Sequence, residues 1–184
     1  MEATDILTAE HRVIERVITS LEIGADRLEK HGDMPAEFFL TAASFITGFA
    51  DGCHHRKEEG VLFKNMAANG MPLEAGPIAV MLAEHEQGRR FTRGMREAAT
   101  RLQSGDTQAK DTVIQNARGY AALLRQHIQK EDNILFPMAD RVIPSPLHDQ
   151  VLEDFEKVEQ EETGEGVHEK YLALADRLEK ESLA

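Results

Sequence analysis

Hydrophobic residues recur along this chain at every third or fourth position, the spacing that buries one face of a helix. Alternation at every second position, which is typical of strands, is scarce. The first apolar seam follows Thr4 and Asp5, either of which would cap a helix, and it stops near Gly32. Its members are Leu7, His11, Ile14, Ile18, Leu21, Ala25 and Leu28. The pattern predicts a long amphipathic helix that carries a histidine on its apolar face.

The same spacing continues through three further long segments, at about residues 35–70, 76–105 and 106–141. Pro35 suits the first turn of a helix, and the sequence "IPSP" at 143–146 would stop one. Beyond it, two shorter helices are predicted at 147–161 and 167–182, on either side of the acidic loop "EETGEG".

Four long helices with short connections favour an all-α fold, an up-down-up-down four-helix bundle over residues 1–142. Residues 143–184 would then form a C-terminal helical extension. We expect this extension either to pack on the bundle or to make the contact of a homodimer.

Two stretches of the chain are repeated. "LTAEHRVIER" (7–16) aligns with "MLAEHEQGRR" (81–90), and "HHRKEEGVLF" (54–63) aligns with "HIQKEDNILF" (127–136). The two offsets, 74 and 73 residues, agree. The bundle is therefore predicted to consist of two duplicated αα-hairpins, with equivalent residues meeting about a pseudo-twofold axis.

The repeated stretches carry polar residues on faces that should be buried. His54 and Glu58 are four residues apart, as are His127 and Glu131, so each pair shares one helix face. His11 interrupts the first seam, and His85 is its repeat partner. A single core histidine is more often merely hydrogen-bonded, and a single HxxxE pair is more often on the surface.

Four histidines and two glutamates facing one core are harder to explain without a ligand, because burying them would cost several kcal/mol unless something neutralised them. Helical bundles build dinuclear metal sites from such residues. Imidazole and carboxylate together suit iron or manganese better than calcium, and the absence of thiolate ligands argues against structural zinc.

At these residues the sequence resembles the hemerythrin-like family of HHE cation-binding domains, over roughly residues 5–140. The motifs, in order, are His11, the HxxxE pair His54–Glu58, His85, and the HxxxE pair His127–Glu131. The resemblance implies a non-haem centre of two Fe ions (Fe2+/Fe3+) in a four-helix bundle. His11 and His54 would bind one iron, and His85 and His127 the other. Glu58 and Glu131 would bridge both, together with a solvent-derived oxo or hydroxo group.

The chain departs from the oxygen-carrying members of that family in two places. Arg89 occupies the position of their fifth histidine, and Asp132 has the spacing of their bridging aspartate. The internal repeat favours Glu131 as the bridge, with Asp132 as the alternative. Glu15 and Arg89 are equivalent in the repeat, so we expect them either to form an ion pair beside the site or to be two separate surface charges.

Three neighbouring residues have weaker signals. His55 also has HxxxE spacing, but its repeat partner is Ile128, so it is expected beside the site and His55→Ala is expected to keep the metal. Tyr120 lies two turns before His127 and either lines the site or packs in the core. Cys53 adjoins His54 and is either redox-sensitive or, as the default interpretation, a buried, inert thiol.

Composition narrows the class of protein further. The formal net charge of -12 argues against a nucleic-acid partner. One cysteine permits no internal disulfide and suits a reducing compartment. No apolar run approaches the ~18 residues of a membrane span, and the N-terminal sequence has no signal-peptide pattern, so a cytoplasmic protein without a membrane partner is expected.

The function predicted from the resemblance is binding or sensing of oxygen, peroxide or nitric oxide at a carboxylate-bridged di-iron site. The alternatives are a di-iron enzyme that removes peroxide or nitric oxide, and a protein that stores or donates iron.

Overall fold

The computed structural model describes residues 3–162 and 167–184, and these residues form helices and turns without any strand. The first long helix is α1 (Ala3–Lys30). The second is continuous but irregular, and it comprises α2 (Ala36–Phe45), η1 (Ile46–His55), η2 (Glu58–Leu62) and α3 (Phe63–Ala68). The third is α4 (Gly76–Gln103). The fourth comprises η3 (Thr107–Ala109), α5 (Lys110–Lys130), η4 (Glu131–Leu135) and α6 (Phe136–Val142).

The positions of the long helices confirm the segments predicted from the apolar spacing. Pro35 precedes the second helix as its cap, with extended backbone, and Gly32 ends the first. Gly32 has a φ of +68°, a left-handed conformation that favours glycine, and its N–H donates to the carbonyl of Arg27 at 3.1 Å. The irregular turns at η1, η2 and η4 were not predicted.

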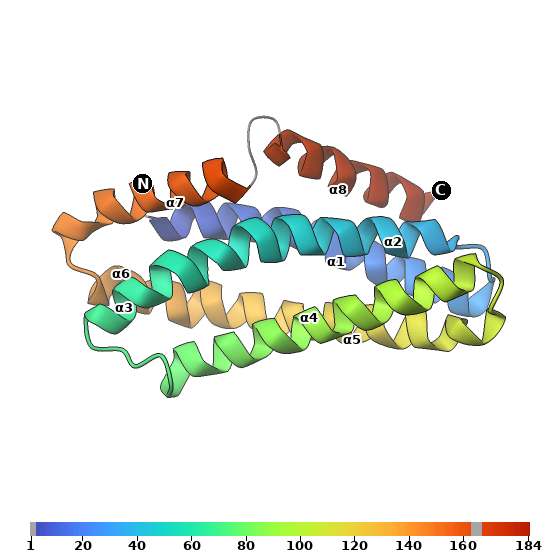
Figure 1. Ribbon diagram of the computed structural model, residues 1–184, viewed down its shortest axis with the longest axis horizontal. Helices are drawn as coiled ribbons and strands as arrows, with labels where there is room; N and C mark the ends of the chain where they lie inside the picture. Colours follow the sequence, from blue (N-terminus) through green and yellow to red (C-terminus); the bar gives the residue numbers. More distant parts are fainter. Residues whose placement is uncertain (1–2, 163–166) are drawn as a thin grey trace.

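The four long helices lie side by side as a helical bundle (Figure 1). α4 packs between α5 and α2, and α1 packs against α5. The chain then passes through η5 (Ser145–Leu147) into α7 (His148–Glu162) and α8 (Val167–Leu183). Of the predicted loop "EETGEG", residues 163–166 lie outside the described residues.

The two C-terminal helices lie along one side of the bundle (Figure 1). α8 packs against α1 and α2, and α7 contacts α1, η1 and η2. A close approach helps to seat α8, because a Cβ added at Gly48 would come within 1.7 Å of the Tyr171 hydroxyl. The C-terminal segment therefore packs on the bundle, and α7 reaches the segments that carry His54, His55 and Glu58.

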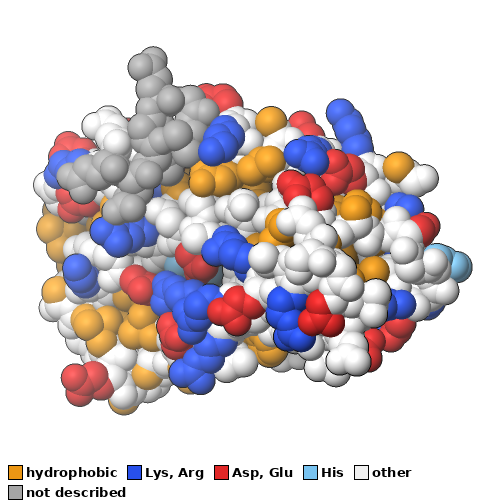
Figure 2. Space-filling view, turned by 45° about the vertical axis from the view of Figure 1, so that its right-hand side comes forward, with side chains coloured by type: hydrophobic (Ala, Val, Ile, Leu, Met, Phe, Trp, Pro, Cys, Tyr) orange, Lys and Arg blue, Asp and Glu red, His pale blue; other side chains and the backbone are white. Residues whose placement is uncertain are grey.

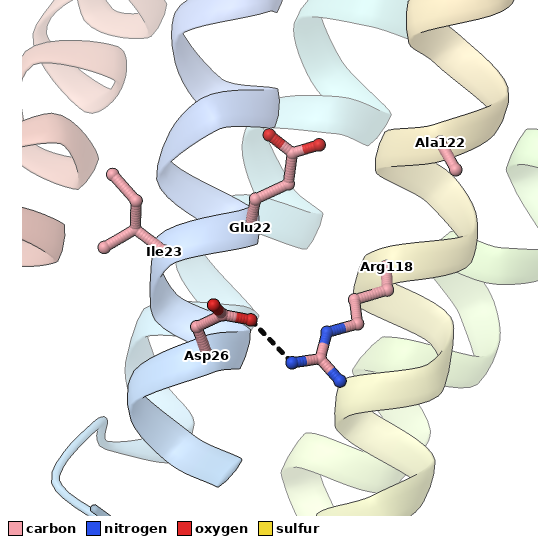
Figure 3. Close-up of a pocket in the computed structure, with 5 residues that line it drawn as sticks. All are labelled: Glu22, Ile23, Asp26, Arg118 and Ala122. Atoms are coloured by element: carbon pink, nitrogen blue, oxygen red, sulfur yellow. Dashed lines mark hydrogen bonds and ion pairs between the residues drawn. The ribbon is translucent and has the colours of Figure 1, made fainter. Parts of the chain in front are cut away.

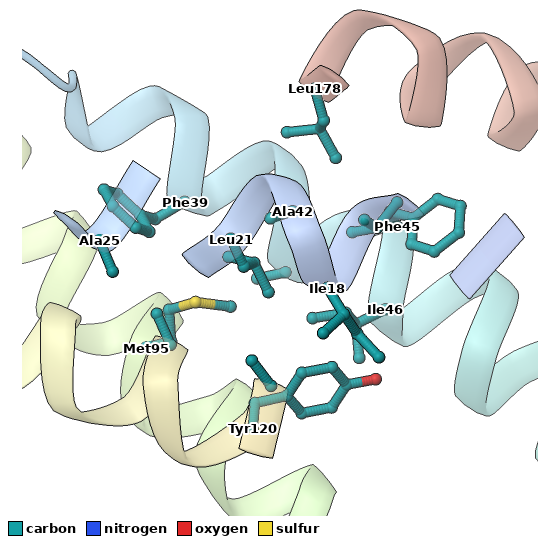
Figure 4. Packing of buried hydrophobic residues seen from close by; sticks show 14 of the residues in the cluster. Ile18, Leu21, Ala25, Phe39, Ala42, Phe45, Ile46, Met95, Tyr120 and Leu178 are labelled. Carbon is teal, nitrogen blue, oxygen red and sulfur yellow. The ribbon is translucent and has the colours of Figure 1, made fainter. Parts of the chain in front are cut away.

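The core consists of two hydrophobic clusters. The larger contains the apolar residues from Ile14 to Leu28 in α1 and those of α2, together with Met95 and Tyr120 (Figure 4). The smaller contains Leu7 with residues of η2, α3, the start of α4, and α6. Along α1 the first cluster begins at Ile14 and the second ends at Leu7, so His11 lies between them. A polar layer thus interrupts the core.

On the outside, cationic and anionic side chains are interspersed on the face shown in Figure 2, with hydrophobic side chains in patches between them. None of the described helices combines the length and the low charge that crossing a membrane requires.

Candidate metal centre

The helices are not regular where they enter the polar layer. η1 and η2 are π-helical, and so is η4, which begins at Glu131. Such widened turns are frequent at functional sites. On a regular α-helix two consecutive residues point in different directions, so only one of His54 and His55 would reach the core. Here both are buried.

Buried histidines and glutamates come together in two adjoining groups. One consists of His11, His54, Glu58 and Glu131, and the other of His55, Glu58, His85 and His127. Within each group, one potential ligand atom of every residue lies within 4.8 Å of the others. The six residues predicted from the sequence therefore lie at one place, and Glu58 belongs to both groups.

Each of the two glutamates directs one carboxylate oxygen toward the first group of histidines and the other oxygen toward the second group. Glu58 has Oε1 3.5 Å from Nε2 of His54 and Oε2 3.3 Å from Nε2 of His85. Glu131 has Oε2 3.2 Å from Nε2 of His11 and Oε1 3.1 Å from Nε2 of His127. Both carboxylates therefore lie between the two groups of histidines.

The residues fit a metal pair because their inward atoms are otherwise unsatisfied. Both oxygens of Glu58 and of Glu131, and Nε2 of His11 and His54, are buried without a hydrogen-bond partner among the described residues. Leaving so many polar atoms unpaired in a core is costly, and cations coordinated by them would remove that cost.

The outward nitrogen of every histidine in the two groups is held by a carboxylate. Nδ1 donates to an oxygen at 2.7–2.9 Å in all five cases, and the pairs are His11–Asp132, His54–Glu10, His55–Asp51, His85–Glu59 and His127–Glu84. An ionised carboxylate only accepts hydrogen bonds, so each Nδ1 carries a proton and Nε2 is the nitrogen that a metal ion would bind. Histidines that bind metals are oriented by outer partners of this kind.

Cations hold these carboxylates in turn. Asp132 is paired with Arg12, and Glu84 with Lys130. Arg89 is paired with Glu59 at 2.6 Å and lies 3.6 Å from Asp51.

Lys57 is the cation that holds Glu10, and it is fully buried. Its ammonium group pairs with Glu10 of α1 and with Glu159 of α7. Because Glu10 also holds His54, this pair connects the C-terminal helix α7 to the centre. The sequence pattern did not indicate Glu10 or Lys57, although Glu10 directly precedes a predicted ligand and Lys57 lies on the helix between His54 and Glu58.

Burial and the mutual proximity of these groups shift their protonation in the metal-free protein. Burial, and then the neighbouring Glu131 carboxylate, raises the pKa of Glu58 to about 8. Burial would also raise the pKa of Glu131, but the neighbouring His127 and then His11 outweigh it and lower that pKa well below its usual range.

The pKa values of the histidines are likewise raised in some cases and lowered in others. For His11, burial is outweighed by Asp132 and Glu131, and its pKa rises to about 9. For His127, burial is outweighed chiefly by Glu131, and the pKa rises to about 10. Burial lowers the pKa of His54 and of His55. Bound cations would displace the protons that Glu58, His11 and His127 hold.

The expectation that His55 lies beside the centre is wrong. Its ring stacks on that of His85, with centroids 3.9 Å apart, and it belongs to the second group of candidate ligands. The internal repeat excluded it because its counterpart is Ile128. The repeat could not register the widened turn, which turns both consecutive histidines inward.

The predicted ion pair between Glu15 and Arg89 is also wrong, since no ion pair joins them among the described residues. Glu15 pairs with Arg12 of its own helix, whereas Arg89 turns toward Glu59 and Asp51. Glu59 accepts a hydrogen bond from His85, and Asp51 accepts one from His55. Arg89 therefore contacts the carboxylates that hold these two histidines, and not Glu15.

The remaining candidates take distinct places. Asp132 lies outside the two groups and accepts the Nδ1 proton of His11, whereas Glu131 faces inward and is fully buried. Tyr120 packs in the larger hydrophobic cluster, as the core alternative predicted, but its hydroxyl has no hydrogen-bond partner among the described residues. Cys53 is a buried free thiol whose pKa burial raises to about 11, so it is inert as expected.

Comparison with known families bears on the same residues. Residues 2–139 match the family model of the hemerythrin HHE cation-binding domain, a span that covers the four long helices except for the last residues of α6. The chain belongs to this family. Hemerythrin-like membership and the clusters of histidine and glutamate together indicate a cation-binding protein, with iron as the metal that the family suggests.

The chain also has relatives in mycobacteria, at low sequence identity. An uncharacterised protein of Mycobacterium bovis and one of Mycobacterium tuberculosis are each 27% identical to the chain over 163 residues. The match covers 89% of this chain but 63% of each relative, so the chain spans less than two thirds of their length. No solved structure gives a significant match.

Proposed function

We propose that this hemerythrin-like chain holds two iron ions and binds or senses oxygen, peroxide or nitric oxide at them. The observation that carries the proposal is the pair of fully buried glutamates, each with one oxygen toward either histidine group and with no other partner for these oxygens among the described residues. Iron bound there would supply reversible electron transfer and coordination positions for a small ligand.

The proposed ligand set is unequal. His11 and His54 would hold one iron, and His55, His85 and His127 the other, with Glu58 and Glu131 shared. The iron with two histidines has fewer protein ligands and is the position at which we place the small ligand. His55 in this role replaces the histidine whose place on α4 is taken by Arg89.

The surrounding residues favour a small, uncharged or weakly charged ligand. The ring of Phe136 stacks on His11 with centroids 5.3 Å apart, and Phe63 lies over His85 at 6.0 Å. Hydrophobic clusters close the layer on both sides, so water is largely excluded. The carboxylates on Nδ1 keep the imidazoles in one orientation and one tautomer.

We also infer that the bundle arose from two duplicated αα-hairpins in up-down-up-down order. The support is the equal spacing of the two repeats, which pairs His11 with His85 and His54 with His127. Glu58 and Glu131, which the repeat also pairs, are the two shared carboxylates of the proposed centre.

The experiment is to load the full chain anaerobically with ferrous iron and to record optical spectra after adding oxygen, peroxide or nitric oxide. A new charge-transfer absorption that disappears when the ligand is removed supports binding. Rapid catalytic loss of peroxide or nitric oxide instead supports an enzyme. Spectra that none of the three ligands changes would overturn the proposal.

A further inference from the structure

A pocket of about 280 Å³ opens between α4 and the helix formed by α2 and η1. Its lining residues are Thr47, Asp51, Arg89, Thr92, Arg93 and Arg96. The three arginines come from successive turns of α4 and share one face of it. Three guanidinium groups therefore surround the pocket against one carboxylate, in a chain whose formal net charge is -12.

The positive charge of Arg96 is not neutralised by its hydrogen-bond partners. Its Nη2 donates to the carbonyl of Ala43 at 3.0 Å and to the hydroxyl of Thr47 at 2.9 Å, both of which are neutral acceptors. Among residues 3–162 and 167–184 it has no carboxylate partner within ion-pair distance. Two bonds leave donors of its five N–H groups for a ligand.

Arg93 and Arg89 are engaged to different degrees. Arg93 reaches Glu86 at 3.3 Å, but its side chain is 57% exposed, so that pair is weak. Arg89 is held firmly by Glu59 at 2.6 Å and also approaches Asp51. The uncompensated positive charge of the pocket therefore lies at Arg93 and Arg96, with Arg89 at its inner side.

A second arginine pocket provides a contrast. It has about 430 Å³ between α1 and α5 and is lined by Glu22, Ile23, Asp26, Arg118 and Ala122 (Figure 3). Arg118 is already paired with Asp26 at 2.6 Å and with Glu29 at 2.8 Å. Acids outnumber the cation there, so a bound anion would be repelled, whereas the balance in the first pocket is the reverse.

We propose that the pocket between α4 and η1 binds a phosphate group, free or as a monoester. A tetrahedral, doubly charged oxyanion matches several guanidinium forks converging from one helix face, because each fork donates two parallel hydrogen bonds. The hydroxyls of Thr47 and Thr92 complete a polar lining.

This site adjoins the candidate metal centre through two carboxylates. Asp51 accepts the Nδ1 proton of His55 at 2.9 Å, and Glu59 accepts that of His85 at 2.7 Å. Arg89 contacts both acids. A phosphate that draws on Arg89 weakens its hold on them, and they then accept more strongly from the histidines. This coupling to the metal rests on the proposed function, whereas anion binding itself does not.

Binding is tested on the full-length, metal-free chain by calorimetry, in a zwitterionic buffer at low ionic strength, with inorganic phosphate and with adenosine monophosphate as probes. One site per chain is expected for at least one probe, and the tighter of the two identifies a free or an esterified source. Arg93→Gln and Arg96→Gln should each weaken binding about tenfold, as loss of a charged hydrogen-bond donor does.

The matched control is Arg90→Gln, because Arg90 lies on the same helix and contacts Glu86 but does not line the pocket. Because the Arg93 side chain is largely exposed, Arg93→Gln should fold normally, and weaker binding in this variant would not be caused by loss of folding. Absence of binding of both probes at millimolar concentration, or an equal loss in Arg90→Gln, would overturn the site.

The coupling has its own readout in the iron-loaded chain. At a phosphate concentration near the wild-type dissociation constant, phosphate should shift the optical spectrum of the iron in the wild type and in Arg90→Gln, and the shift in Arg93→Gln should be several times smaller. An equal shift in Arg93→Gln would mean that phosphate acts on the iron directly, and the coupling would be wrong even though calorimetry had established the pocket.

Discussion

At the scale of single residues, the candidate centre depends on which imidazole nitrogen carries the proton. Each of the five histidines donates Nδ1 to a carboxylate, so that Nε2 is left for a metal. His55 has the same arrangement, through Asp51, as the four histidines that the sequence motifs indicated. A histidine with a merely structural role would not need Nδ1 on a carboxylate and Nε2 directed toward the other candidate ligands.

Replacing His55 with alanine should therefore weaken metal binding by about tenfold to a hundredfold, at least as much as loss of an outer partner does. Competition with a chelator for ferrous iron measures the affinity. His31→Ala is the control, since His31 is exposed and remote from the centre. Equal affinities of His55→Ala and the wild type would exclude His55 as a ligand.

Tyr120 offers a second test at this scale. Its hydroxyl is buried without a partner among the described residues, and the pKa of the phenol is raised well above its usual value by burial. An unsatisfied hydroxyl costs about 1–3 kcal/mol, so Tyr120→Phe should leave the free energy of unfolding unchanged or raise it. Urea denaturation measures this, and a clear destabilisation would show that the hydroxyl has a partner after all.

At the scale of elements, apolar spacing and the repeat were sufficient to predict the long helices and six of the seven inward residues. A periodicity argument assumes a regular helix, and it therefore admitted His54 and rejected His55. The π-helical turns at η1 and η2 break that assumption where the function lies. The pairing of Arg89 with Glu59 was not predicted. It depends on how two neighbouring helices face each other, and the spacing of residues along one helix does not give that information.

The junction of α7 with the bundle depends on Lys57. Lys57→Met removes the buried ammonium group that pairs with Glu10 and should lower the free energy of unfolding by about 3 kcal/mol. Glu159→Gln removes the other partner, whose side chain is 41% exposed, and should cost less than about 1 kcal/mol. Urea denaturation of the metal-free protein compares them, and similar costs for the two variants would contradict the assignment of Glu10 as the main partner.

At the scale of the whole molecule, the fold divides its hydrophobic core into two clusters and places the charged layer between them. The α7 and α8 helices lie along one side of the bundle (Figure 1), and α7 contacts η1 and η2, which carry residues of this layer. Metal binding should therefore stabilise the entire chain, because it neutralises a layer that both halves of the core enclose.

The pH dependence of metal binding follows from the same layer. At pH 7 the metal-free protein holds protons at Glu58, His11 and His127, whose pKa values are raised to about 8, 9 and 10. Binding must expel them, so affinity should rise with pH up to about 10, most steeply below pH 8 where all three protons are held, with release of up to three protons. Calorimetry in buffers of different ionisation enthalpy counts the protons, and an affinity that falls with rising pH would contradict the assignment.

The proposed function requires that the chain bind two iron ions through shared glutamates. Elemental analysis of the full chain after anaerobic loading with ferrous iron and removal of free metal tests it most directly. We expect two iron ions per chain in the wild type and fewer in His127→Ala, which removes a candidate ligand of the second group. One iron per chain or none in a folded wild-type protein would contradict it.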